Sequence, residues 1–331
     1  MRVRTTLPAV AVATLTTMFT AVLGAPAHAE SRTLSGPTTG DPDTFLTYVG
    51  CDGVFGQGAA PQSRINLGPY SAPLGRRSLG IVPAGSGSAS GPYSRFGSLT
   101  GLDASLSVAA TGGSQGVSYV VAVTPDSPAG TAWAGRAAVS VPAGGWSQVS
   151  AASLTYDWTL ADLASRRPVS DAGSGTPAAF AAQHGDGPGF VVTGFGCDSR
   201  PFNLDAVRSG GSTFDFEGLS LTTTIGTAVK QVAAGGEVTL TGRVTDGNGR
   251  VTGDPLVLES RTGNGAWTPV GGPELAGADG LARVVVPLTE TTEFRWHRPQ
   301  SQYADEGWSD TVTVTVAEPE VEPGKVEPGK K

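Results

Sequence analysis

One pentapeptide in the sequence has the spacing of a hydrolase nucleophile. Residues 112–116 read Gly-Gly-Ser-Gln-Gly and match Gly-x-Ser-x-Gly, in which a strained strand-to-helix turn exposes a serine to a histidine and an oxyanion hole. Here a strand-like run, residues 117–123, follows Ser114 where the motif requires a helix. The partner would have to be His184, which we expect in a loop. We therefore interpret the pentapeptide as a turn in a glycine-rich chain.

Carboxylates that could hydrolyse a glycosidic bond are few in residues 30–229. Such a reaction uses two carboxyl groups on either side of a cleft, one of them with a raised pKa. Between residues 30 and 229 the only glutamates are Glu30 and Glu217. The aspartates that could partner them lie in alternating strand-like runs, where polar residues face outward in any case: Asp157, Asp205 and Asp215. The sequence predicts a protein that is not an enzyme.

Aromatic residues in turn-rich segments offer a different chemistry, the binding of sugars. Sugar rings present apolar C–H faces that stack on aromatic rings, while neighbouring polar side chains bond the hydroxyls. Trp133 follows the turn-rich segment 128–132. A large apolar side chain next to turns is less readily explained as part of a buried core. Trp133 is the first predicted ligand-binding residue, and Tyr70 and Tyr93, in Pro/Gly-rich segments, are the next. Three other aromatic residues are expected in the core: Trp146, Tyr156 and Trp158.

The N-terminus has the pattern of an export signal. Arg2 and Arg4 precede an apolar stretch, residues 7–23, and Ala27-His28-Ala29 is a small-x-small site of the kind that signal peptidase accepts. We predict a signal peptide over residues 1–29, cleaved after Ala29, and a secreted, extracellular protein. No second long apolar segment follows, so no membrane span is predicted.

The only two cysteines of the sequence lie in a repeated tripeptide. Gly-Cys-Asp occurs at residues 50–52 and again at 196–198, each time after a strand-like run. An exported protein enters an oxidising compartment, where a lone cysteine pair persists as a disulfide. We predict a bond between Cys51 and Cys197, which would stabilise the fold by about 5 kcal/mol in the loop-closure model.

Three aspartates in the same part of the chain could hold a structural calcium ion, and no other cofactor is expected. Calcium takes carboxylate and carbonyl oxygens as ligands, and Asp52, Asp198 and Asp205 are the residues that could supply them. Each of the three could instead cap a turn, as aspartates do in short loops. Both interpretations stay open from the sequence.

Composition excludes one class of partner and favours one class of fold. The 331 residues include 48 Gly and 24 Pro but only 15% charged residues, and the formal net charge is -7. Nucleic-acid binding requires clustered Lys and Arg, so no nucleic-acid partner is expected. Short strand-like runs between Gly- and Pro-rich turns predict an all-β protein.

The strand-like runs fall into two groups with different spacing. Residues 43–228 are predicted to form a jelly-roll-like β-sandwich, with short helices at 159–166 and 177–184. Residues 229–317 are predicted to form an immunoglobulin-like β-sandwich, in which Phe294 and Trp296 share one face of a strand. A flexible leader, residues 30–42, precedes them. A disordered tail rich in Pro, Glu, Gly and Lys, residues 318–331, follows them.

Two segments carry resemblances to known families. Residues 238–246 (Val-Thr-Leu-Thr-Gly-Arg-Val-Thr-Asp) and 292–296 (Thr-Glu-Phe-Arg-Trp) resemble the bacterial Ig-like domains appended to exported actinobacterial proteins. A second set of segments, residues 185–190, 194–198, 202–208 and 214–218, is similar to uncharacterised actinobacterial secreted proteins, and to the closing strands of jelly-roll carbohydrate-binding modules. The first resemblance implies an accessory spacer or adhesion unit, and the second supports the fold more than a ligand.

These observations together predict a secreted, non-catalytic binding protein. Its ligand would be a glycan or another component of a cell surface, bound by the first sandwich, with the second sandwich as a spacer. Two alternatives stay open: a structural or adhesion protein that binds protein partners through exposed strand edges, and a cryptic hydrolase. The sequence does not determine the oligomeric state.

Overall fold

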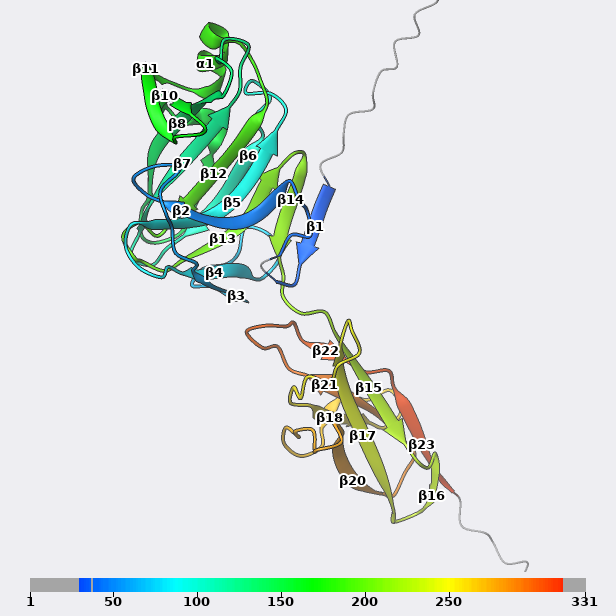
Figure 1. The fold of residues 1–331 in the computed structure, drawn as a ribbon. Coiled ribbons are helices and arrows are strands. Elements are labelled where there is room, and N and C mark those ends of the chain that lie inside the picture. The colour runs from blue at the N-terminus through cyan, green and yellow to red at the C-terminus, as the bar shows by residue number, and fades with distance from the viewer. Residues whose placement is uncertain (1–29, 37, 318–331) are drawn as a thin grey trace, which may run out of the picture.

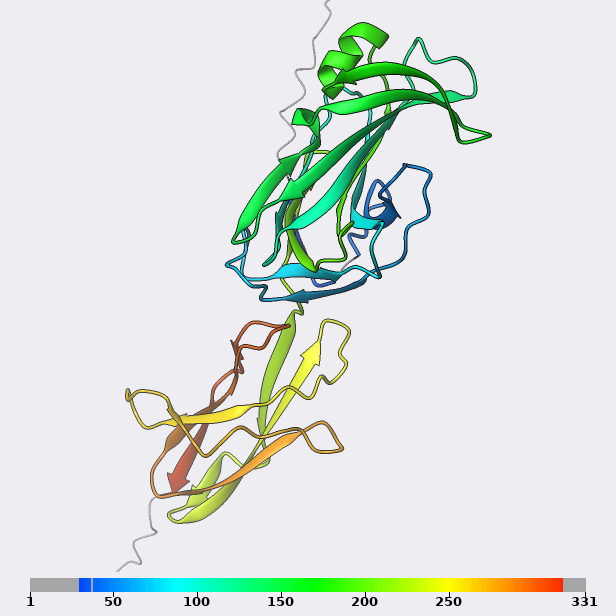
Figure 2. The same ribbon diagram turned by 90° about the vertical axis from the view of Figure 1, so that its left-hand side faces the viewer.

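The computed structural model describes residues 30–36 and 38–317. Within this range the chain forms 23 β-strands, one α-helix and one short 3-10 helix, which confirms the predicted all-β class. Figures 1 and 2 show two bodies, with the first sandwich above the second. The predicted signal peptide, residues 1–29, and the predicted tail, residues 318–331, lie outside the described residues. No helix in the described part of the chain is long and apolar enough to cross a membrane.

Two seven-stranded sheets, which we call sheet A and sheet B, form the first sandwich. Sheet A consists of β1 (Glu30–Leu34), β14 (Ser212–Phe216), β13 (Phe202–Ser209), β4 (Ser78–Val82), β3 (Gln62–Asn66), β6 (Ala104–Ala109) and β9 (Trp146–Ser150). Its central strand β13 pairs with β6 along one edge, while β4 and β14 share the other edge. The pairing of β13 with β6 has a bulge after Asp205, where Ala206 has a φ of 47°. This bulge lies between the part of β13 that pairs with β4 and the part that pairs with β14.

Sheet B is antiparallel throughout, and its strand order runs from β11 at one edge to β2 at the other. In that order its strands are β11 (Arg167–Gly175), β10 (Tyr156–Asp162), β8 (Thr131–Val141), β7 (Ser114–Ala122), β12 (Gly189–Phe195), β5 (Ser88–Phe96) and β2 (Thr44–Gly50). Alternate residues of β8, such as Ala137 and Val139, are buried, whereas Arg136 and Ala138 are exposed. This period of two leaves one face of sheet B in the core and the other face outward.

The core of the first sandwich lies between the two sheets. One cluster contains Phe195 and Phe202, which meet across the sheets, with Phe214 beside them. A second cluster contains Tyr156 and Trp158, both nearly fully buried as predicted. Burial of such large side chains is the main favourable term in folding a sandwich of this kind.

Helix α1 (Pro177–His184) confirms the helix predicted at 177–184. The Thr176 side chain caps its first turn by accepting a hydrogen bond from the N–H of Ala179, and Pro177 opens the helix. Gly185, with a φ of 83°, ends it. The helix lies at the end of the first sandwich that is remote from the second sandwich (Figures 1 and 2).

Two local predictions are wrong. Residues 159–166 form the end of β10 and its turn to β11 rather than a helix, because Trp158 and Leu160 alternate into the core while β10 pairs with β8. The supposed flexible leader contains β1, which pairs in parallel with β14. Leu34 at the end of β1 belongs to the core cluster, and that apolar contact orders a segment whose composition is otherwise polar.

The predicted disulfide is confirmed. Cys51 follows β2 and Cys197 follows β12, and their sulfur atoms are bonded at 2.04 Å across 146 residues of sequence. Strand β5 separates β2 from β12 in sheet B, so the bond spans the end of β5. The N–H of Cys51 donates to the carbonyl oxygen of Gly87, and the N–H of Gly87 donates to that of Cys197. These two hydrogen bonds hold both cysteines against the turn before β5.

A three-stranded and a six-stranded sheet form the second sandwich. The first consists of β15 (Leu221–Thr227), β17 (Gly236–Asp246) and β20 (Ala282–Leu288). The second consists of β16 (Gln231–Ala233), β23 (Val312–Ala317), β21 (Thr292–Arg298), β18 (Val257–Arg261), β19 (Thr268–Pro269) and β22 (Gly307–Trp308). Phe294 and Trp296 of β21 are fully buried between the sheets with Leu240 and Leu258.

Candidate functional site

The outer face of sheet B carries a row of side chains that crosses all seven strands. Directly paired residues of neighbouring strands share a face, and the strand registers align seven of them: Phe45, Tyr93, Val192, Tyr119, Arg136, Asp157 and Ser174. The neighbours of Arg136 and Asp157 along their strands, Ala137 and Trp158, belong to the core. The row therefore points away from sheet A.

One end of this row is aromatic. The rings of Phe45 and Tyr93 stack at 4.5 Å between centroids, and Phe190 stacks on the other side of Tyr93 at 5.1 Å. Burial raises the pKa of the Tyr93 hydroxyl. Tyr93, predicted in a loop, therefore lies within β5 between two aromatic rings, and only Phe45, 40% exposed, opens widely to solvent.

The loop that follows the disulfide covers the middle of the row. The Tyr119 hydroxyl donates to the carbonyl oxygen of Gly50 at 2.9 Å. The Arg136 guanidinium donates to the carbonyl oxygen of Cys51 through Nε at 3.3 Å and Nη2 at 2.9 Å. These bonds and the disulfide fix where the loop leaves β2, so the residues after Cys51 have a defined position over sheet B.

A groove of about 370 Å³ lies between this loop and the turn from β10 to β11. Its apolar surface includes Phe55, which is 37% exposed, together with Val54 and Pro168. Its polar lining includes the charged side chains Asp52, Arg136, Asp157 and Arg166. The volume falls in the range of small-molecule sites, which are mostly apolar with a few directed polar groups.

The charged groups of the groove have spare hydrogen-bonding capacity. Asp157 accepts a hydrogen bond from the Ser174 hydroxyl at 2.5 Å and retains further lone pairs. Among the ion pairs formed within residues 30–36 and 38–317, none includes Arg136 or Arg166. A bound molecule with several hydroxyl groups would therefore find both donors and acceptors at the rim.

The prediction that Trp133 is an exposed binding residue is wrong. Trp133 lies in β8, is only 6% exposed, and points into the core beneath α1. Its indole Nε1 donates to Asp126 at 3.1 Å, and its ring contacts those of Phe180 and His184. The turn-rich segment before it ends where β8 begins, so the tryptophan is a core residue of the strand.

Tyr70 lies in the connection between β3 and β4 and is half-buried. Both of these strands belong to sheet A, so Tyr70 is not part of the outer face of sheet B. Of the three aromatic residues predicted to bind a ligand, the structure places Tyr93 alone on this face.

The three aspartates predicted as calcium ligands do not come together. The described residues contain no group of three or more His, Cys, Asp or Glu side chains that could hold a metal ion. Asp198 accepts from the N–H of Gln115, and Asp205 accepts from the N–H of Leu74. Asp52 lines the groove. The turn-capping interpretation fits Asp198, which also accepts from the N–H of Arg200 two residues later. It does not fit Asp205, which lies within β13 and accepts from the backbone of a segment far away in the sequence.

Ser114 and His184 do not form a nucleophile and base. Ser114 is buried at the start of β7. His184 lies near the other end of that strand, because its ring contacts Trp133 and Trp133 pairs with Ala122, the last residue of β7. Eight residues of extended strand span about 26 Å. His184 instead pairs with Asp126 through Nδ1 at 2.7 Å.

Comparison with known protein families and with curated proteins finds no match for this chain. Sequence reasoning missed Phe55, Arg136 and Arg166, and it considered Asp157 only as half of a catalytic pair. An aromatic residue in the Gly-rich segment directly after Cys51 was the signal that could have identified Phe55.

Proposed function

We propose that the protein is a secreted, non-catalytic binding protein whose first sandwich holds a saccharide of a glycan or cell surface. The observation that carries this proposal is the groove on sheet B, where exposed Phe55 lies beside Arg136 and Asp157. An aromatic ring suits the apolar face of a sugar, and charged groups suit its hydroxyls.

The way in which the groove is built also supports binding. The disulfide and the bonds from Tyr119 and Arg136 hold the covering loop before a ligand arrives. A site that is already ordered loses less conformational entropy when it binds, so more of the contact energy remains as affinity.

Retention on insoluble polysaccharides tests this function. We expect the purified protein to sediment with cellulose, chitin or peptidoglycan, and Phe55→Ala and Asp157→Asn each to lower retention at least severalfold, since both remove a direct contact. Val82→Ala, an exposed apolar residue of sheet A, is the matched control and should bind as the parent does. Retention that both groove variants leave unchanged would rule out the groove as the site.

One observation favours the alternative of a protein partner. Strand β11 is an edge of sheet B and carries Val169, the side chain of which is 59% exposed. Unpaired edge strands can add a strand from another chain. Under this alternative, Val169→Lys would abolish capture of a protein partner, and free sugars would not compete with that partner.

A further inference from the structure

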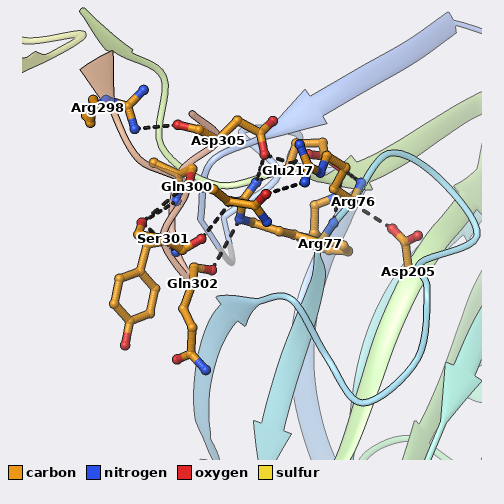
Figure 3. A network of polar contacts seen from close by, with 12 residues as sticks. Arg76, Arg77, Asp205, Glu217, Arg298, Gln300, Ser301, Gln302 and Asp305 are labelled. Atoms are coloured by element: carbon orange, nitrogen blue, oxygen red, sulfur yellow. Dashed lines mark hydrogen bonds and ion pairs between the residues drawn. The ribbon is translucent and has the colours of Figure 1, made fainter. Parts of the chain in front are cut away.

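A fully buried arginine joins the two sandwiches. Arg77 lies directly before β4 of sheet A, and its side chain is 0% exposed. The acceptors of its guanidinium hydrogen bonds belong to the second sandwich, in the loop between β21 and β22 (Figure 3), and the Glu217 carboxylate forms an ion pair with Nη1 at 3.9 Å. Burying a charge between two bodies costs desolvation free energy unless hydrogen-bonding partners offset it. The position of Arg77 therefore depends on both sandwiches.

Each nitrogen of the guanidinium has an acceptor across the junction. Nε donates to the carbonyl oxygen of Gln302 at 3.2 Å, and Nη2 donates to that of Ser301 at 2.9 Å. Nη1 donates to the carboxylate of Asp305. Separating the sandwiches would leave these donors without their partners, so the geometry opposes independent motion.

The first sandwich holds the arginine from the other side. Oε1 of Glu217 accepts hydrogen bonds from the backbone N–H groups of Arg76 and Arg77, the latter at 3.1 Å. The N–H of Glu217 in turn donates to the carbonyl oxygen of Leu34 at 2.9 Å. The loop that carries Arg77 is thus tied to the ends of β14 and β1.

The connection between the sandwiches is itself packed into the junction. Only residues 217–220 separate β14 from β15. Gly218 has a φ of 86°, and a Cβ atom there would lie 2.3 Å from the carbonyl oxygen of Tyr303. The N–H of Leu219 donates to that same oxygen at 2.9 Å. A linker bonded in this way does not behave as a free hinge.

We propose that Arg77 and Gly218 lock the two sandwiches into one rigid unit, with the second sandwich as a stiff stalk. Sequential domains ordinarily move relative to each other unless their interface is strong. Here the buried guanidinium and the closely packed linker restrain both rotation and bending. The outer face of sheet B is therefore held in one direction relative to Ala317, at the end of β23. This inference does not depend on what sheet B binds.

Distances between spin labels test the rigidity in the full chain. Ser140→Cys in the first sandwich and Thr239→Cys in the second introduce exposed label sites. The described residues contain no free cysteine, so labelling needs no reductant and leaves the disulfide intact. We expect a single narrow distance peak from the labelled parent.

Two variants break the junction in different ways. Arg77→Gln removes the charge, and Gly218→Ala keeps the guanidinium but puts a Cβ atom 2.3 Å from the carbonyl oxygen of Tyr303 and 3.1 Å from Cδ of Arg77, so that the linker must move away. Each should replace the narrow peak with a broad distribution, while circular dichroism of both sandwiches remains that of the parent. Arg283→Gln, at an exposed arginine paired with Asp279, is the control and should keep the narrow peak. A broad distribution in the parent, or a narrow one in Gly218→Ala, would overturn the proposal.

Discussion

At the scale of single residues, two carboxyl groups beside the junction make folding depend on pH. Burial raises the pKa of Asp205 to about 6. Burial, with the charge of Glu217, raises the pKa of Asp215 to about 6. Both groups bind more protons in the folded chain than in the unfolded chain over the window between their folded and unfolded pKa values. Their contribution to stability is therefore present in acid and is lost as the pH rises through about 6.

Asp215→Asn tests this dependence. One oxygen of Asp215 is buried and accepts no hydrogen bond within the described residues. The neutral amide should raise the free energy of unfolding at pH 7.5 by about 1 kcal/mol, a value reduced for solvent screening because the residue is only half-buried. Urea unfolding at pH 4 and pH 7.5 measures the change. The gain should vanish at the lower pH, and Asp310→Asn at an exposed site should show none.

At the scale of elements, α1 owes its position to one aromatic side chain. Phe180 stacks on Trp158 at 4.0 Å between ring centroids and meets Trp133 edge-on at 5.3 Å. The helix has only eight residues, too few to be stable by itself in water. Packing against sheet B therefore stabilises it, and the same packing explains why Trp133 is buried.

Phe180→Ala should show how much this packing contributes. Removing a fully buried phenylalanine leaves a cavity and should lower the free energy of unfolding by about 3–5 kcal/mol. Gln183→Ala, on the exposed side of the same helix, changes no core contact and should be nearly neutral. Denaturant unfolding of the two variants side by side measures the difference, and equal stabilities would contradict the assigned role of Phe180.

At the scale of the whole molecule, the disulfide constrains a long stretch of chain. It joins residues 146 positions apart, and cross-linking such a loop lowers the entropy of the unfolded state. Replacing both cysteines by alanine should therefore lower the stability of the first sandwich by about 5 kcal/mol in the loop-closure model. Unfolding followed by tryptophan fluorescence measures this loss. A small loss would indicate that the unfolded chain keeps residual structure.

Local patterns predicted much of the fold but little of the candidate site. The helix at 177–184 was predictable because its cap, its opening proline and its terminal glycine are neighbours in sequence. The groove was not, because Phe55, Arg136 and Asp157 come from segments far apart in the chain. The prediction that Trp133 is exposed was wrong for the same reason, because the rings that bury it belong to α1, some fifty residues later in the chain.

The sequence by itself determined the all-β class, the cysteine pairing and the alternation that buries Phe294 and Trp296. Each of these follows from residue type and short-range periodicity, which act before distant segments meet. Only the tertiary structure decided which face of sheet B is hollowed, which aromatic residues reach solvent, and that Arg77 lies buried between the sandwiches. Those outcomes depend on which strands become neighbours, and strand order is set by the packing of the whole core.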